Sequence, residues 1–272
     1  MPALSISPQV FSILSALVAD RAGLHFDATN VSVFADKVGA RAAAAGFESL
    51  LDYYYFLRYD ANGSVELDAL VEALVVNETY LFRELAPIET IVSEVLIPAL
   101  GGGRRPRLWC AACATGEEPH TIAMLLAARG VLGDVEIVAS DVSGRAIERA
   151  RSGRFGRRAL RQPLPEFAER WVTVDEDGVI VRPRLTGAIT WRQINLMDDQ
   201  TVASLGTFDA VLCRNVLIYF NDTTTRRVVD RLAARLRIGG ALLVGVSESL
   251  LRFGTSLVCE ELNGVFLYRR SQ

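Results

Sequence analysis

The chain has few histidines and cysteines, and this scarcity limits the chemistry it can support. Its 272 residues include two histidines, His25 and His120, and four cysteines. Three of the cysteines stand inside apolar runs, which is typical of buried free thiols in a reducing compartment. Cys110 and Cys113 have the spacing of half a zinc site, but no second Cys or His pair could complete the four ligands. We therefore expect no disulfide and no metal site.

Long apolar runs are also missing. No stretch approaches the roughly 20 residues that a membrane-spanning helix needs. The segment from Phe11 to Ala19 lacks the basic flank and the small-residue cleavage site of a signal peptide, so it predicts an amphipathic helix. With 50% hydrophobic and 22% charged residues, the composition is that of a globular protein. We expect a cytoplasmic protein that does not insert into a membrane.

Charge is small overall but unevenly placed. The formal net charge of −3 argues against a general nucleic-acid binder. The chain up to Val76 has four basic and nine acidic residues, whereas Arg145 to Arg161 holds seven arginines against Glu148 alone. Such a run can be an ordinary solvated helix face or an anion-binding surface. The pattern leaves both interpretations open.

The stretch from Arg107 to His120 carries the strongest local signal. The apolar run from Leu108 to Ala114 predicts a buried parallel strand, which a tight turn separates from an amphipathic helix. This order brings a helix N-terminus to the carboxyl edge of a sheet, where ligands of open α/β sheets bind. Glu117 and Glu118 in the turn would repel a pyrophosphate but suit ribose hydroxyls or a cation. The stretch therefore favours a positively charged nucleoside such as S-adenosylmethionine.

A second acid follows at the end of the next predicted strand, Val135 to Val142. Asp141 comes about 20 residues after the first turn, the spacing of the acid that binds ribose in dinucleotide folds. Ser143 is a predicted N-cap of the helix that follows. An acid at a strand end can also cap the next helix, so both roles remain open for Asp141.

The chain before the central stretch shows helical periods and no strand, which predicts an all-α N-terminal domain over residues 1–86. A connecting helix from Ile88 to Leu100 and three glycines after it place a linker at residues 87–105. Residues 106–272 alternate strands with helices, which predicts a Rossmann-like α/β domain with a mostly parallel sheet.

Further strands are expected at Ile189–Leu196, Phe208–Cys213 and Ala241–Val246, and a terminal antiparallel hairpin at Leu257–Glu261 and Val265–Arg269. Alternating apolar residues on both sides of Asp175–Gly178 predict another hairpin. It interrupts the alternation of strands and helices at about residues 168–188. We therefore expect a small antiparallel β-subdomain inserted in the α/β domain.

Four segments together resemble the CheR family of chemotaxis-receptor methyltransferases. They are Asn77–Glu84, Ala112–Pro119, Ala139–Asp141 and Cys213–Phe220. Each is weak by itself, but all four stand in the family's order, behind a helical domain and with a hairpin insert. The resemblance covers nearly the whole chain. It implies an S-adenosylmethionine-dependent protein-glutamate O-methyltransferase that acts on the cytoplasmic domain of a chemoreceptor, for sensory adaptation, and releases S-adenosylhomocysteine.

The resemblance also implies site residues, by their positions in the family's motifs. The implied cofactor contacts are Asn77, Thr79, Arg83, Glu118, Asp141, Asn195, Leu196, Arg214 and Asn215. Arg83 and Tyr219 are implied as catalytic residues: Arg83 would orient the acceptor carboxylate through bidentate hydrogen bonds, and Tyr219 would line the methyl-transfer centre. Without the resemblance, Asn77, Thr79 and Arg83 would be interpreted as a helix cap with a solvated arginine, and Tyr219 as a core residue.

Some features depart from the family's pattern. The family's N-terminal domain commonly carries a basic helix that docks on the receptor, but here Lys37 and Arg41 stand nearly alone among alanines. The short acidic loop Asp175–Gly178 resembles that of members that act without the receptor's C-terminal peptide tether. His120 replaces the usual tyrosine. We expect a monomer that does not bind nucleic acid. The alternatives are a nucleic-acid methyltransferase that uses Arg145–Arg161 and a non-catalytic cofactor sensor.

Overall fold

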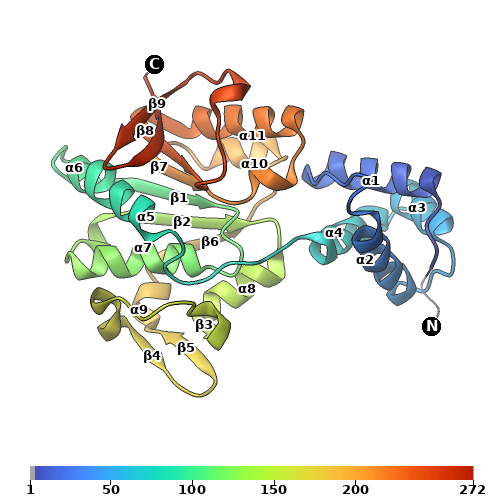
Figure 1. Ribbon diagram of the computed structural model, residues 1–272, viewed down its shortest axis with the longest axis horizontal. Coiled ribbons are helices and arrows are strands. Elements are labelled where there is room, and N and C mark those ends of the chain that lie inside the picture. Colours follow the sequence, from blue (N-terminus) through green and yellow to red (C-terminus); the bar gives the residue numbers. More distant parts are fainter. Residues whose placement is uncertain (1–3, 272) are drawn as a thin grey trace. The chain divides into compact units, whose positions relative to one another are not determined.

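The computed structural model describes residues 4–271, and the chain divides into two compact units (Figure 1). The first unit comprises the chain up to Val76 together with Tyr219–Thr224. The second comprises Asn77–Ile218 and the chain from Thr225 onward. No helix within residues 4–271 has the length and apolar character needed to cross a membrane.

The described part of the first unit is helical up to Val76, as the sequence predicts. Its helices are α1 (Pro8–Ala22), α2 (Val31–Ala44), α3 (Leu50–Tyr59) and α4 (Gly63–Leu74). Ser7 caps α1, because its side chain accepts a hydrogen bond from the Val10 amide (3.2 Å), and a proline occupies the first turn. Leu14, Leu17 and Val18 recur at helical spacing and are buried, so α1 turns one apolar face into the unit's core.

A seven-stranded sheet forms the centre of the second unit, in the order β6-β2-β1-β7-β8-β10-β9. Its strands are β1 (Arg107–Ala111), β2 (Glu136–Asp141), β6 (Ile189–Gln193), β7 (Phe208–Cys213), β8 (Leu236–Val244), β9 (Leu257–Leu262) and β10 (Val265–Arg270). Neighbours from β6 to β8 pair in parallel, and β10 pairs antiparallel with β8 and β9. This mostly parallel sheet with an antiparallel edge hairpin confirms the predicted fold class.

Helices cover both faces of this sheet, as the right-handed crossovers between parallel strands require (Figure 1). They are α5 (Leu85–Ile91), a π-helical turn (Val92–Leu96), α6 (Ile97–Leu100), α7 (Glu117–Ala128), α8 (Gly144–Ser152), α10 (Asp199–Ser204) and α11 (Asp222–Arg235). Short 3₁₀ turns lie at Leu132–Asp134, Arg157–Ala159, Glu166–Trp171, Leu217–Tyr219 and Leu251–Phe253. Every residue of β7 is buried, which explains why five of its six residues are apolar, and the sixth, Asp209, pairs with Arg104.

A separate three-stranded antiparallel sheet follows α8 in the chain. Its strands are β3 (Arg154–Gly156), β4 (Val172–Val174) and β5 (Gly178–Val181), in the order β3-β5-β4, and the helix α9 (Pro183–Thr186) comes after them. The hairpin of β4 and β5 was predicted from the sequence. At Gly178, a Cβ atom would lie 2.0 Å from the Phe155 carbonyl oxygen, so the close approach of β3 and β5 requires glycine.

Candidate active site

Most of the predicted site residues follow the carboxyl ends of parallel strands. Asp141 ends β2, and Arg214 and Asn215 follow β7 directly. Glu118 stands in the first turn of α7, just after β1. In the sheet, β1 lies between β2 and β7. The strand that follows β1 in the chain lies on one side of it and β7 lies on the other side, so the strand order reverses at the carboxyl end of β1. Ligands of open α/β sheets bind at such a switch point, so the structure brings these residues to a suitable edge.

The turn between β1 and α7 is held in an uncommon backbone conformation. Ala112 (φ 57°), Ala114 (φ 48°) and Gly116 (φ 92°) all have left-handed dihedral angles. A Cβ atom on Gly116 would lie 2.6 Å from the Cβ of Ala150 in α8. Non-glycine residues in this region cost roughly 1–3 kcal/mol each and persist only where their surroundings determine the conformation. The turn is therefore fixed before any ligand binds.

Asp141 is one of the residues that fix the turn. Its side chain is buried, and Oδ2 accepts a hydrogen bond from the Ala114 amide (2.8 Å). Oδ1 accepts from the Ser143 amide (2.9 Å), and Ser143 in turn caps α8. Asp141 thus braces the entrance to α8, one of the two roles that the sequence left open. Ribose binding, the other role that the sequence left open, stays a prediction.

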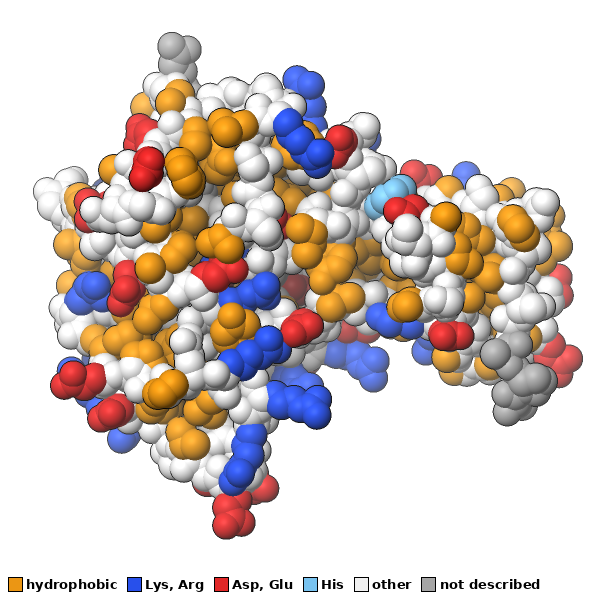
Figure 2. All heavy atoms as spheres, in the orientation of Figure 1, with side chains coloured by type: hydrophobic (Ala, Val, Ile, Leu, Met, Phe, Trp, Pro, Cys, Tyr) orange, Lys and Arg blue, Asp and Glu red, His pale blue; other side chains and the backbone are white. Residues whose placement is uncertain are grey.

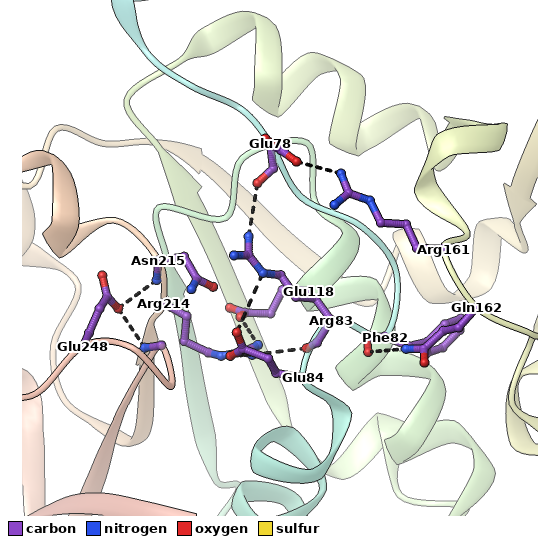
Figure 3. A network of polar contacts seen from close by, with 11 residues as sticks. Glu78, Phe82, Arg83, Glu84, Glu118, Arg161, Gln162, Arg214, Asn215 and Glu248 are labelled. Atoms are coloured by element: carbon purple, nitrogen blue, oxygen red, sulfur yellow. Dashed lines mark hydrogen bonds and ion pairs between the residues drawn. The ribbon is translucent and has the colours of Figure 1, made fainter. Parts of the chain in front are cut away.

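Arg214 lies between two carboxylates at the centre of the site (Figure 3). Its side chain is 2% exposed and donates to Glu118 (2.8 Å) and to Glu84 (2.7 Å). Burial alone would lower the pKa of Arg214, but Glu118 and Glu84 outweigh that effect and raise its pKa overall. When both carboxylates are ionised, these three side chains carry a net negative charge, which favours a cationic ligand nearby.

The loop before α5 carries three further predicted contacts, Asn77, Thr79 and Arg83. Phe82 (φ 63°) and Glu84 (φ 47°) have left-handed backbones, and the Phe82 amide donates to Thr121 Oγ1 of α7 (3.1 Å). Arg83 is half-buried and donates to the Glu78 carbonyl (3.3 Å). Asn77 and Thr79 cap no helix, because α5 begins only after Glu84. The helix-cap interpretation of this segment is therefore wrong.

Glu248 supports the site, although it was not predicted from the sequence. Its carboxylate accepts hydrogen bonds from the amides of Asn215 (2.8 Å), Leu217 (2.8 Å) and Gly245 (2.7 Å). It therefore ties the turn after β7 to the turn after β8 (Figure 3). A Cβ atom on Gly245 would lie 2.6 Å from Asn215 Nδ2. The available signal was an acid just beyond a strand end, outside every motif that we recognised.

The other predicted residues are placed as follows. Asn195 and Leu196 come directly after Ile194, at the end of β6, and Asn195 Oδ1 accepts from the Met197 amide (2.9 Å). Leu196 is buried. Tyr219 falls in the segment that belongs to the first unit, where its carbonyl accepts from the His25 amide (2.8 Å). Its catalytic role stays a prediction.

No residue of this edge is suited to remove a proton at neutral pH through an imidazole or a thiol. His120 is fully buried; Nδ1 donates to the Gly116 carbonyl (2.7 Å) and Nε2 accepts from Thr186 Oγ1 (3.0 Å). Burial lowers the pKa of His120 to about 4, so the ring is neutral. Burial raises the pKa of the thiols of Cys110, Cys113 and Cys213. The site therefore depends on carboxylates and arginines.

These groups fit the parts of S-adenosylmethionine. Its ribose hydroxyls match a carboxylate at a strand end such as Asp141, and its positive charge matches the net negative charge around Arg214. The negative charge at the first turn of α7 is unsuited to a pyrophosphate, in agreement with the preference for a cationic nucleoside.

Comparisons with known proteins show the family. Residues 77–263 match the family described as CheR methyltransferase, SAM binding domain, and residues 9–75 match CheR methyltransferase, all-alpha domain. The chain is 34% identical to chemotaxis protein methyltransferase 2 of Vibrio cholerae, covering 76% of this chain and 74% of that protein. It is 31% identical to the chemotaxis protein methyltransferase of Vibrio parahaemolyticus, covering 92% of each. It is 36% identical to the probable biofilm formation methyltransferase WspC of Pseudomonas aeruginosa, covering 86% of this chain and 56% of that protein. The chain therefore belongs to the CheR methyltransferase family, and its second unit contains the S-adenosylmethionine-binding domain of a methyltransferase.

Proposed function

We propose that this methyltransferase transfers a methyl group to glutamate side chains in the cytoplasmic domain of a chemoreceptor, forming glutamate methyl esters. The names of its chemotaxis relatives support the class of substrate protein. The observation that best supports a carboxylate as the methyl acceptor concerns His120. Its ring is buried, neutral and hydrogen-bonded through both nitrogens, so it is not available as a general base. A glutamate with a pKa near 4.3 is already ionised at neutral pH, so its methylation needs no general base.

The cofactor, S-adenosylmethionine, supplies a methyl group on a positively charged sulfur. The residues proposed to hold it are Asn77, Thr79, Arg83, Glu118, Asp141, Asn195, Leu196, Arg214 and Asn215. Arg214 fixes the position of Glu118 through a 2.8 Å ion pair, so that the carboxylate keeps one orientation. Asp141 accepts hydrogen bonds from the sugar while it braces the turn after β1.

Arg83 is proposed to position the acceptor carboxylate. Its contacts with Glu78 (3.3 Å) and with Glu84 (4.0 Å) are long, and its side chain is 29% exposed, so its planar fork can turn toward a carboxylate. The acceptor loses its negative charge as the methyl group is transferred. A tight ion pair would therefore stabilise the ground state more than the transition state, and for this reason we assign Arg83 to orientation. Tyr219 is proposed to line the same centre.

Methylation of purified receptor fragments tests this function. The protein is incubated with S-adenosylmethionine labelled in its methyl group and with cytoplasmic fragments of chemoreceptors from the same organism. A glutamate methyl ester releases its label as methanol in mild alkali. We expect label on the fragment that is lost in alkali. Label that survives alkali would contradict a carboxylate acceptor.

A further inference from the structure

Exposed arginines gather on the second unit beside the candidate site. Arg145, Arg149, Arg151, Arg154, Arg157, Arg158 and Arg161 are all exposed, on α8, β3 and the 3₁₀ turn after it. Figure 2 shows basic side chains over the region where Figure 1 places α8 and β3. The structure thus favours an open charged surface over a single solvated helix face, since the arginines come from three successive elements.

Some of these arginines already have partners. Arg151 pairs with Glu148 (2.9 Å), Arg157 donates to the Glu176 carbonyl (2.6 Å) and Arg161 pairs with Glu78 (2.8 Å). The others, Arg145, Arg149, Arg154 and Arg158, make no ion pair within residues 4–271, and we call these four the arginine rim. Their charges are available to a partner without the loss of an ion pair.

Both ends of the segment that carries the rim are attached to loops of the candidate site. At its start, the Ser143 amide donates to Asp141 (2.9 Å). At its end, the Leu81 amide donates to the Ala159 carbonyl (2.8 Å), and the guanidinium of Arg161 lies 4.4 Å from the centre of the Tyr80 ring. The rim therefore borders the two loops that contain Asp141 and Arg83. A protein segment that delivers a glutamate side chain to this edge passes beside the rim.

The first unit offers little positive charge to such a segment. Of its four basic residues, Arg21 pairs with Asp68 (2.6 Å) and Arg41 pairs with Glu66 (2.5 Å). Lys37 donates to the Leu74 carbonyl (3.1 Å). Nine acidic residues outnumber the basic ones in the chain up to Val76. Lys37 and Arg41 are thus both engaged inside the unit, and its charge would repel an acidic partner.

We propose that the arginine rim docks the anionic segment that surrounds the acceptor glutamate of the substrate protein. This inference rests on the proposed function, which makes the substrate a protein region with ionised glutamates. Opposite charges on the two surfaces speed their encounter and suppress unsuitable partners, more than they add to the affinity of the final complex. The rim therefore helps to select the substrate, while the residues of the sheet edge hold the cofactor.

A polypeptide fits the rim better than a nucleic acid. Single strands bind where aromatic side chains offer surfaces for stacking, but Phe155, the one aromatic residue between Arg145 and Arg161, is buried. Acidic residues also interrupt the positive field, because Glu148 pairs with Arg151 and the acidic loop at Glu176 contacts Arg157.

Reversal of two rim charges tests the proposal. The variant Arg154→Glu/Arg158→Glu changes residues that contact no predicted site residue. The matched control is Arg105→Glu/Arg129→Glu, which makes the same charge change at exposed positions before β1 and after α7, at the opposite edge of the sheet. For methylation of the receptor fragment we expect kcat/KM of the rim variant to fall about 10-fold or more, through KM, with a weaker dependence on salt. The dissociation constant of S-adenosylmethionine, measured by calorimetry, should stay unchanged, and the control should behave like the wild type.

The outcomes separate this proposal from the function on which it rests. If the wild type forms the alkali-labile ester and the rim variant methylates equally well, the docking surface is wrong and the function stands. If the wild type forms no ester, the proposed function is wrong. The role of the rim is then tested by a titration of the same fragment in the presence of S-adenosylhomocysteine. Equal binding of the fragment by the rim variant and the wild type would overturn the docking proposal. Binding of a short DNA duplex that is lost in the rim variant, with methylation unchanged, would assign the rim to nucleic acid and also overturn it.

Discussion

At the scale of single residues, two carboxylates brace the edge of the sheet through backbone amides. Asp141 accepts from Ala114 and Ser143, and Glu248 accepts from four amides in the turns after β7 and β8. Hydrogen bonds from neutral donors to a charged acceptor are among the stronger ones in proteins. These two side chains therefore hold the loops that the cofactor would contact, in addition to any contact of their own.

Glu248→Gln tests the bracing role. The amide group of glutamine can accept through its oxygen only, so its NH₂ would face two of the backbone donors that Glu248 now satisfies, whichever way the group is turned. A donor left unsatisfied costs about 1–3 kcal/mol, and we expect the affinity for S-adenosylmethionine to weaken about 10-fold as the turn loosens. The matched control is Glu261→Gln, an exposed acid on β9. Calorimetry that gives the same dissociation constant for Glu248→Gln and wild type would contradict this role.

The site residues that could be predicted from the sequence are those that lie in recognisable motifs. Glu118 and Asp141 could be predicted from the chain because they follow recognisable apolar runs. Glu84 stands inside a recognised motif, but its ion pair with Arg214 joins residues 130 positions apart, and no local pattern reports such a pairing. Glu248 lay outside every motif. Its importance follows from the adjacency of β7 and β8, which only the folded sheet shows.

At the scale of elements, strands with a clear apolar pattern were predictable, and the short strand β3 was not. β7 was predicted with its observed bounds, because five of its six residues are apolar. β3 was missed, since its three residues lie within an arginine-rich run and only Phe155 points into the core. A helix from Ile88 to Leu100 was predicted, but the helical segment begins at Leu85, and its π-helical turn at Val92–Leu96 was not predicted. That turn precedes Pro98, which cannot donate in a regular helix, and a π turn is one known way to accommodate such a break.

The hairpin of β4 and β5 supports a prediction about the receptor's peptide tether. The side chain of Asp175 accepts from the amides of Asp177 (2.9 Å) and Gly178 (3.0 Å), so the loop is compact as well as acidic. β4 is an edge strand of three residues and offers few backbone groups to an added strand. We therefore expect no measurable binding of a free tether pentapeptide in a calorimetric titration. Receptor fragments with and without the tether should be methylated at equal rates, and micromolar binding of the peptide would refute this expectation.

At the scale of the whole molecule, the two units differ in charge and in what they could contribute. The acidic first unit keeps three of its four basic side chains engaged, whereas the second unit combines the sheet edge with the arginine rim. Uneven charge was visible in the sequence, but the sequence could not show which arginines have partners. Arg151 and Glu148 are three positions apart in the chain, whereas Arg161 and Glu78 are 83 positions apart and join distant segments.

The stability of the second unit should depend on pH through His120. The pKa of this buried ring is lowered from 6.5 to about 4, mainly by burial. Above pH 6.5 the ring is neutral in both the folded and the unfolded state. Between pH 6.5 and 4 the unfolded state binds the proton more readily, so the free energy of unfolding falls by about 1.4 kcal/mol per pH unit, or about 3 kcal/mol in total.

His120→Gln removes the titrating ring and should remove this part of the acid sensitivity, whatever it does to stability at pH 7. All three tryptophans, Trp109, Trp171 and Trp191, lie in the second unit, so their fluorescence during urea unfolding reports on that unit. From pH 7 to pH 4 we expect the variant to lose about 3 kcal/mol less than the wild type, because the acidic groups common to both proteins cancel in the comparison. His25→Gln, which removes an exposed ring from the first unit, is the control and should match the wild type. Parallel pH profiles for His120→Gln and wild type would mean that the fold does not lower the pKa of the ring between Gly116 and Thr186, and that an imidazole able to act as a base near neutral pH is present beside the turn after all.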